Sequence, residues 1–298
     1  MAKTNKIKTP FDDKIFYTVS YAILFFVITV ILYPLIYVVS ASMSSADAVA
    51  SGRVVFLPVD ISFDGYKAVF EHKDVFRGYG NSIFYGVVGT LINVSLTMIT
   101  AYPLARKNLP YKKGIMMLFT FTMLFSGGMI PSYILLKNLK MINTIYAILI
   151  PGAISVYNVI VTRTFIQNIP NDILEAAHID GCSDFRMFFK IILPLSKSVM
   201  AVITLYYFVA HWNAYFNAFI YLNDRELYPL QVILREILLM NEIDQSLITD
   251  SEAMMAMESR AEQLKYALII VSSLPVIIAY PFVQKFFVKG VMVGSVKG

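Results

Sequence analysis

Charged residues are scarce in this sequence. Only 15% of its 298 residues are Asp, Glu, Lys or Arg, whereas 57% are hydrophobic. Several charge-free stretches are long enough to cross a bilayer, which takes about 20 apolar residues. A soluble domain of this size could not bury so much apolar surface. The sequence therefore predicts an all-α protein with several transmembrane helices.

The residues that several kinds of chemistry require are also missing. A single cysteine cannot form an intramolecular disulfide, and three scattered histidines do not suggest a metal site. Neither a Gly-x-x-x-x-Gly-Lys-Ser/Thr phosphate loop nor a Gly-x-Ser-x-Gly nucleophile motif occurs, so the chain is not expected to hydrolyse ATP. The predicted spans contain no carboxylate, which an ion-coupled carrier would need. Basic residues flank the spans, which favours membrane orientation over nucleic-acid binding.

Six spans are predicted from the charge-free runs, at about 16–39, 80–105, 114–136, 142–162, 198–222 and 265–285. With both termini in the cytoplasm, 15 of the 25 Lys and Arg residues lie inside, as the positive-inside rule expects. The predicted layout is a cytoplasmic N-terminus at 1–15, a six-span domain at 16–288, external segments at 40–77 and 223–262, and a cytoplasmic tail at 289–298. In the second external segment, helical spacing predicts an amphipathic helix with Leu230, Ile233, Leu234, Ile237 and Leu238 on one side.

The polar segment 169–194, between spans four and five, predicts two short helices joined by a sharp corner. Pro170 suits a first helical position, and Asp172 places a negative charge near the amino end of the helix. Gly181 can adopt the left-handed conformation that stops a helix, and Ser183 is a favourable N-cap for the second one. The first helix has an apolar side, which suits docking into a groove of another protein.

Part of this segment resembles a known motif. Glu175-Ala176-Ala177, followed by Asp180-Gly181, Phe188 and Leu193-Pro194-Leu195, resembles the cytoplasmic coupling loop of the permease subunits of ATP-driven importers. Cys182 and Ser198 depart from the family pattern, which usually has alanine and often has proline at these places. The resemblance implies that the segment contacts the ATPase subunits through Glu175, Ala176, Ala177, Asp180, Gly181, Arg186, Phe188 and Pro194.

Two other stretches narrow the resemblance. The run FSGGMIPSY from Phe125 to Tyr133, together with Asn143-Thr144, is similar to the polysaccharide branch of the sugar permeases. Its glycine pair would interrupt span three, either as an unwound turn beside the substrate path or as a kink that serves packing. The ending Gly294-Ser295-Val296-Lys297-Gly298 resembles that of maltose-type permeases, in which the tail reaches the ATPase pair. Lys297 and Gly298 are therefore expected to contact the ATPases.

Span five carries polar and aromatic side chains, which are costly in a membrane unless they face the protein interior or water. Trp212 and Asn213 lie about 22 Å beyond Lys197 at 1.5 Å per residue, which is deeper than an interfacial aromatic belt. Aromatic rings and amides suit the binding of a sugar. On a continuous helix, Trp212 and Tyr215 would share a face. The alternative to sugar binding is that these residues only pack in the protein interior, above all His211. The residues expected to border the substrate pathway are Tyr206, His211, Trp212, Asn213, Tyr215, Asn217, Gly127 and Gly128.

The resemblance as a whole implies the type I permease fold of an ABC importer and a place in the bacterial cytoplasmic membrane. The implied partners are a second, homologous permease subunit, two cytoplasmic ATPase subunits that bind ATP and Mg, and an extracytoplasmic solute-binding protein. The expected substrate is an oligosaccharide or polysaccharide fragment. The chain itself is expected to be no enzyme, to hold no cofactor and to bind no nucleic acid. Two alternatives stay open: an ABC permease for a non-sugar solute, and an ATP-independent membrane carrier.

Overall fold

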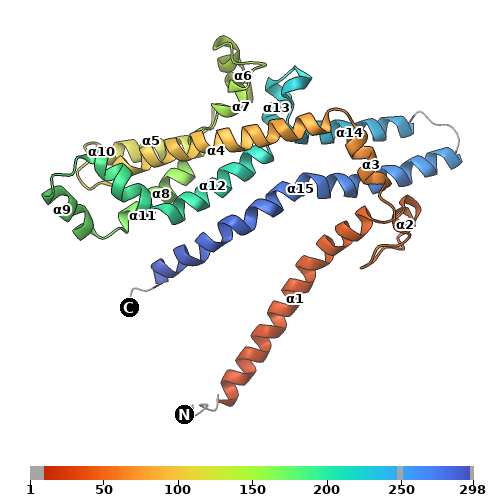
Figure 1. Cartoon of the computed structure of the whole chain (residues 1–298), viewed down its shortest axis with the longest axis horizontal. Coiled ribbons are helices and arrows are strands. Elements are labelled where there is room, and N and C mark those ends of the chain that lie inside the picture. The colour runs from red at the N-terminus through yellow and green to blue at the C-terminus, as the bar shows by residue number, and fades with distance from the viewer. Residues whose placement is uncertain (1–9, 247–250, 296–298) are drawn as a thin grey trace. The chain divides into compact units, whose positions relative to one another are not determined.

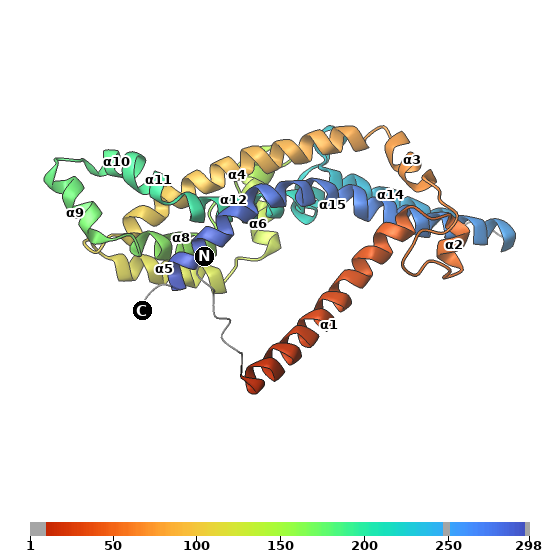
Figure 2. The ribbon, with the colours of Figure 1, turned by 60° about the horizontal axis from the view of Figure 1, so that its bottom comes forward.

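The computed structural model describes residues 10–246 and 251–295, which are mainly helical (Figure 1, Figure 2). These residues contain no strand beyond an isolated bridge between Ser44 and Ile61. Contacts divide the chain into two units, Met1–Glu71 with Leu238–Val271 and His72–Ile237 with Ser272–Gly298. The second unit holds the segment 169–194 and the predicted span five.

The first unit contains α1 (Phe11–Ser42), α2 (Ala46–Ala50) and α3 (Asp64–Glu71). The apolar stretch of α1 is not buried within the chain, as is typical of a helix that contacts lipid or another subunit. The chain just after α1 is held by α15 (Ser251–Ser295), where Gln263 Nε2 donates to Ser44 O at 2.8 Å. The rings of Tyr37 and Tyr266 also lie 5.6 Å apart. These contacts fix the carboxyl end of α1 within its unit.

The second unit packs α8 (Val156–Gln167) and α12 (Lys197–Trp212) against α4 (Val75–Ala105), and α4 and α12 lie side by side (Figure 1). Buried side chains of all three helices form its main core. Two glycines of α4 allow the close approach of α12. A Cβ on Gly86 would lie 2.9 Å from the Phe208 ring, and one on Gly89 would overlap the imidazole of His211. Small residues at helix crossings are typical of membrane proteins.

The predicted third span is sharply bent at its glycine pair. α5 (Lys112–Leu124) and α6 (Met129–Asn138) are bent by 110°, and Gly128 has φ +84°, a conformation that favours glycine. The predicted interruption of the helix is therefore confirmed. A Cβ on Gly127 would meet nothing within 4 Å in the part of the chain that is described, so packing inside the chain does not require this glycine.

The predicted fourth and fifth spans are not continuous helices either. Pro151 and Gly152, the latter with φ +74°, form a turn between α7 (Tyr146–Leu149) and α8. α12 ends at Trp212, and α13 (Phe216–Tyr221) follows after a short break. The expectation that Trp212 and Tyr215 share a face of one helix was therefore wrong. Asn213, the C-cap of α12, has a side chain that competes for backbone hydrogen bonds and favours helix ends.

By length and composition, three helices among the described residues are able to cross a membrane: Phe11–Ser42, Val75–Ala105 and Ser259–Pro281. Two bent pairs meet the same criterion together, α5 with α6 and Asp184–Leu195 with α12, the second pair bent by 78°. This part of the chain thus provides up to five spans. The count of six, the segment boundaries and the cytoplasmic position of the termini stay predictions.

α14 (Leu230–Ser246) forms where the amphipathic helix was predicted, and its first part packs on the start of α4. Leu230 N donates to Ser82 Oγ at 2.8 Å, and Ile233 lies against Gly78. The preceding turn, η2 (Arg225–Leu227), is held by Asn81, whose Nδ2 donates to Glu226 O at 2.7 Å. The first turns of α4 therefore contact α14. At the other end of α4, Arg106, which follows its last residue, contacts the segment 169–194.

Gly89→Ala should destabilise the second unit, because the added methyl group overlaps His211 and displaces it from Asn93, whose Nδ2 lies 3.2 Å from His211 Nε2. Overpacking of this kind costs about 1–3 kcal/mol. Thermal unfolding of the purified protein in detergent should have a lower midpoint. Gly80→Ala is the control, because a Cβ there meets nothing within 4 Å and alanine favours a helix by about 1 kcal/mol over glycine. Equal midpoints for the two variants would contradict the close approach of α4 and α12.

Candidate functional site

The segment 169–194 forms the two predicted helices. Its elements are, in order, α9 (Asn171–Ile179), α10 (Asp184–Met187), a π-helical turn (Phe188–Ile192) and α11 (Leu193–Leu195). α9 begins directly after Pro170, and α10 follows Ser183, whose Oγ accepts a hydrogen bond from Arg186 N at 3.4 Å. The N-cap predicted at Ser183 is therefore confirmed.

The corner between α9 and α10 depends on Gly181, which has φ +73°. Its N–H donates to His178 O at 3.0 Å, and the N–H of Cys182 donates to Ala177 O at 2.9 Å. This pair of hydrogen bonds is the Schellman motif, which satisfies carbonyl groups at a helix end. The left-handed conformation predicted for Gly181 is therefore confirmed.

The eight residues expected to contact the ATPases divide into two sets. Ala177 and Phe188 are buried in the core of the unit, and the Phe188 ring lies 5.4 Å from that of Tyr102. The other six are exposed: Glu175, Ala176, Asp180, Gly181, Arg186 and Pro194. The first set holds the segment in place, and the second is accessible to a partner.

Apolar side chains add to the exposed surface of α9 and the chain that follows it. Ile179 is 87% exposed and Phe185 is 76% exposed, and Ile173 and Phe189 are exposed as well. The rings of Phe185 and Phe189 lie 4.7 Å apart. Exposed apolar side chains that gather in a polar segment are typical of a protein-binding surface.

Arg106, the residue that follows α4, joins both helices of the corner to that helix. Its guanidinium forms an ion pair with the Asp184 carboxylate of α10, and its Nη2 donates to His178 Nε2 of α9 at 3.2 Å. Because arginine only donates, this Nε2 must be the unprotonated ring nitrogen. The guanidinium carbon also lies 5.9 Å from the centre of the Tyr102 ring. Sequence reasoning treated Arg106 only as a charge that marks the cytoplasmic side, and missed these contacts.

Basic side chains also satisfy carbonyl groups at the end of α4. Arg163 Nε donates to Leu104 O at 3.0 Å, and Lys112 Nζ donates to Arg106 O at 2.8 Å. Such carbonyls lack partners within the helix and carry partial negative charge, so cations are favoured beside them. α5 and α8 are thereby bound to residues 104–106, which we name the coupling end of α4.

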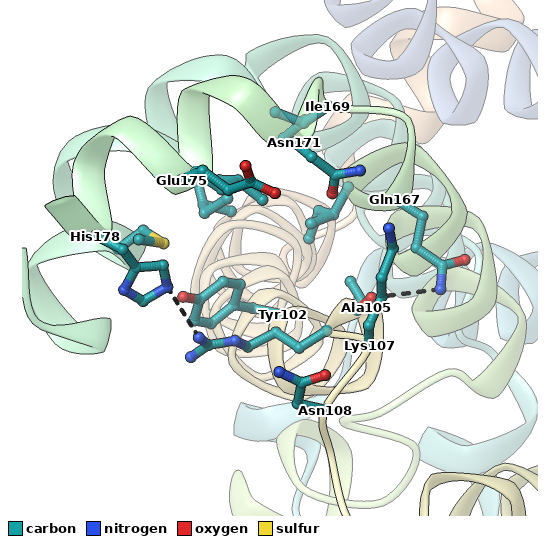
Figure 3. A pocket seen from close by; sticks show the side chains of 14 residues that line it. Tyr102, Ala105, Lys107, Asn108, Gln167, Ile169, Asn171, Glu175 and His178 are labelled. Carbon is teal, nitrogen blue, oxygen red and sulfur yellow. Dashed lines mark hydrogen bonds between the residues drawn. The ribbon is translucent and has the colours of Figure 1, made fainter.

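A pocket of about 430 Å³ lies beside the coupling end (Figure 3). Tyr102, Glu175 and His178 line it, and Gln167 Nε2, also at its wall, donates to Ala105 O at 3.4 Å. The pocket separates side chains of α9 from side chains of α4 and α8. A movement of α9 would therefore change its shape directly.

A separate cavity of about 390 Å³, lined by both polar and apolar residues, lies among α4, α8, α12 and α13. Asn93 of α4 is only 3% exposed; its Nδ2 contacts His211 Nε2, and its Oδ1 has no hydrogen-bond partner among the described residues. Tyr207 OH lies 2.7 Å from Thr97 Oγ1 and accepts from Ser155 N at 3.1 Å. The polar side chains that line the cavity are Asn93, Ser155, Tyr157, Asn158, Tyr206, Tyr207, His211 and Asn217.

The structure brings three of the predicted pathway residues together in the lining of this cavity: Tyr206, His211 and Asn217. Sequence reasoning missed Asn93 and Asn158, which lie on helices other than α12. Each is an amide inside a charge-free run, which is the same signal that drew attention to span five. Applying that signal to every predicted span would have found both.

Trp212 is packed inside the unit, outside the lining of this cavity. It is 1% exposed, and its Nε1 donates to Ser272 O at 2.8 Å. Its ring lies 6.2 Å from that of Phe208 and 6.1 Å from that of Tyr79. Trp212 does not belong to the cavity lining, so the alternative interpretation, core packing, describes its surroundings.

The remaining predicted residues also lie outside the cavity lining. Asn213 and Tyr215 lie at the break between α12 and α13. Gly127 and Gly128 lie at the bend between α5 and α6. The tail residues Lys297 and Gly298 lie outside the described residues.

Apolar helices able to cross a membrane, a cavity among helices and an exposed segment of the coupling type together define a helical membrane transport subunit. The family described as "Binding-protein-dependent transport system inner membrane component" matches residues 13–293. The chain belongs to this family, and it is therefore an inner-membrane permease component of an ABC importer rather than the ATPase.

Individual relatives agree with this assignment. The chain is 38% identical to "Polygalacturonan/rhamnogalacturonan transport system permease protein YtcP" of Bacillus subtilis (strain 168), over 96% of this chain and 99% of the relative. It is also 38% identical to "Protein LplC" of the same organism, over 89% of each chain. One chain in the crystal structure of a bacterial ABC transporter involved in the import of the acidic polysaccharide alginate matches with a TM-score of 0.80 and 34% identity, covering 95% of this chain and 100% of that one. The predicted ABC permease fold is therefore confirmed.

Gly181→Ala should loosen the corner between α9 and α10, because a non-glycine residue in the left-handed conformation costs about 1–2 kcal/mol. Side-chain crowding plays no part, since a Cβ there would meet nothing within 4 Å. Substrate-stimulated ATPase activity and uptake should both fall in proteoliposomes that contain the complete transporter. Gly181→Asn should lose less, because asparagine tolerates this conformation better. Gly114→Ala, at an equally open glycine without positive φ, is the control, and an equal loss there would refute the role of the corner.

Arg106→Gln should release α9 and α10 from the coupling end of α4. An exposed ion pair contributes about 0.2–1 kcal/mol, so backbone amides in 171–187 should exchange with deuterated water up to about fivefold faster. Asp184→Asn should add little to Arg106→Gln, because the two residues share one interaction. Lys107→Gln, which removes the next cation along the chain, is the control. The same acceleration in Lys107→Gln would mean that general charge, and not the Arg106 contacts, orders the segment.

Proposed function

We propose that this chain forms one side of the translocation pathway of an ABC importer for an acidic oligosaccharide or polysaccharide fragment. A second permease subunit forms the other side, and two ATPase subunits that bind ATP and Mg dock on α9 and α10. An extracytoplasmic binding protein delivers the sugar. The observation that carries the proposal is the cavity among α4, α8, α12 and α13.

The chemistry of the cavity suits a sugar. Its lining combines amides, phenols and one imidazole with apolar side chains, and it includes no Lys, Arg, Asp or Glu among the described residues. Amides such as Asn158 and Asn217 donate and accept hydrogen bonds, as sugar hydroxyls require, and rings such as Tyr206 pack on the apolar C–H faces of a pyranose. The unpaired Oδ1 of Asn93 adds an acceptor. Neutral groups of this kind bind a sugar without holding it by charge.

The relatives support the choice of an acidic substrate. The YtcP relative is named for polygalacturonan and rhamnogalacturonan, and the transporter that contains the matching chain is described by its import of alginate. Both names denote polysaccharides that contain uronic acids. The identities of 38% and 34%, over nearly the whole of this chain, make a related substrate class the simplest inference.

α4 connects the coupling segment with the cavity in this proposal. Arg106 and Asn93 are thirteen residues apart, about 20 Å along a helix. Arg106 holds α9 and α10, whereas Asn93 contacts His211 of α12 at the cavity. When the ATPases close and move α9, α4 moves with it and shifts against α12. The cavity then opens to one side of the membrane and closes to the other, as alternating access requires.

Asn217→Ala should lower uptake, because an amide at the cavity wall loses its hydrogen bonds to the sugar, worth about 1 kcal/mol each or about fivefold. The measurement is uptake of an acidic oligosaccharide by proteoliposomes with the complete transporter and saturating binding protein. Asn213→Ala is the matched control, because this amide is exposed and lies outside the cavity lining. A loss in Asn213→Ala without one in Asn217→Ala would place the pathway elsewhere. Import of a non-sugar solute with no import of sugar would refute the substrate class.

A further inference from the structure

A cluster of one cation and two aromatic rings lies apart from both the cavity lining and the coupling segment. The guanidinium carbon of Arg235, on α14, lies 4.4 Å from the centre of the Tyr215 ring and 5.9 Å from that of the Phe219 ring. The two rings stack with their centres 5.6 Å apart and their planes 22° from parallel. Arg235 is exposed and Phe219 is 60% exposed, so the described residues leave one side of this Arg235 cluster uncovered.

Arg235 has no carboxylate partner among the described residues. The adjacent Glu236 is engaged elsewhere, because its Oε2 accepts a hydrogen bond from Arg225 Nη2 at 2.7 Å. The same Arg225 nitrogen lies 3.7 Å from Asp74, which also pairs with Arg77. Glu236 and Asp74 thus pair with other arginines. Arg235 is held against aromatic rings, and no described carboxylate pairs with it.

This geometry leaves the guanidinium ready to bind a carboxylate. A guanidinium whose carbon lies over a ring still has N–H donors, and these match the two oxygens of a carboxylate. The exposed ring of Phe219 offers an apolar surface beside the same group. A uronic acid residue presents both features together, a carboxylate and the C–H face of a pyranose ring. A neutral sugar would use only the ring.

The Arg235 cluster lies toward the opposite end of α4 from the coupling end. α14 begins at Leu230, which bonds to Ser82, and Ile233 packs on Gly78, whereas Arg106 follows the last residue of α4 (Figure 1). Asn93, at the cavity, lies between these two ends. α13 carries Asn217 at the cavity and Phe219 in the cluster, so the two sites are separated by about one helix diameter, roughly 10 Å. The order along α4 is therefore cluster, cavity and coupling segment.

We propose that Arg235, Tyr215 and Phe219 form an entry site that binds a uronic acid residue of the substrate through its carboxylate, before the sugar reaches the cavity. This inference rests on the proposed function and deepens it, because it assigns the recognition of substrate charge to a particular residue. The other possible occupant is a carboxylate of a partner protein, either the binding protein or the second permease. The two possibilities predict different results when only the charge of the sugar is changed.

The test compares two probes of one chain length: an oligogalacturonate, and the same preparation after full methyl esterification, which replaces every carboxylate with a neutral ester. Uptake of both is measured in proteoliposomes with the complete transporter and saturating binding protein. Arg235→Gln should lower the ratio of acid uptake to ester uptake about tenfold, because a hydrogen-bonded charge pair is lost only with the acid. Arg235→Lys should restore part of the ratio, since it keeps the charge and loses the two-pronged geometry. Arg260→Gln removes another exposed arginine outside the cluster and should leave the ratio unchanged.

Three results would overturn the inference, and they are distinguishable. An unchanged ratio of acid uptake to ester uptake in Arg235→Gln would mean that Arg235 does not bind the carboxylate of the substrate. An equal loss of both probes, together with weaker binding of the loaded binding protein to the transporter, would assign Arg235 to a partner carboxylate. If the wild-type transporter imported neither probe, the proposed function itself would be refuted, and the entry site with it.

Discussion

The carbonyl groups at the end of α4 need hydrogen-bond partners, and the arrangement of the second unit follows from how they find them. Arg163 and Lys112 approach these carbonyls from α8 and α5, so three helices meet at one point. Arg106 belongs to the same short stretch, and its side chain continues the network to α9 and α10. This helix end, together with the buried Ala177 and Phe188, therefore fixes the position of the segment 169–194. Loss of order at this end would weaken the attachment of that segment to the rest of the unit.

The second constraint is the close contact between α4 and α12. In a membrane no hydrophobic effect drives helices together, so close packing and hydrogen bonds between helices must do so. Gly86 and Gly89 allow the approach, and the Asn93 to His211 and Thr97 to Tyr207 contacts add polar bonds along the same line. Asn93, Tyr207 and His211 also line the cavity. Three of the four side chains that bond the helix pair are therefore also part of the surface offered to a solute.

Features that depend on neighbouring residues were predictable from the sequence. The corner at Gly181, the cap at Ser183 and the bend at Gly128 all depend on a few consecutive residues whose backbone preferences are strong. The permease fold was also predictable, since the motif that resembles the family pattern lies in one continuous segment. The amphipathic pattern of α14 was likewise visible, because its spacing reflects one buried side.

Features that depend on which helices meet were not predictable. Arg106 and His178 are separated by 72 positions, and nothing near Arg106 in the chain indicates that its partner lies on α9. Trp212 shows the same difficulty. Its distance from Lys197 correctly indicated a position inside the protein, but the direction of its side chain depends on where α12 ends and on the contact with Ser272. The position of a residue along a helix follows from counting residues, whereas the direction of its side chain depends on how the helices pack.

The distribution of charge along α4 has a consequence for transport of an acidic sugar. A cation inside the cavity would have to lose its hydration and would then hold an anionic sugar tightly, which would slow its release. A pathway works best when binding is strong enough for entry and weak enough for exit. The described lining of the cavity contains apolar and neutral polar side chains with one histidine and no Lys, Arg, Asp or Glu, whereas Arg235 lies toward the far end of α4 from the coupling segment. In the proposed arrangement, the charge selects the sugar where it enters, and the neutral cavity lets it leave.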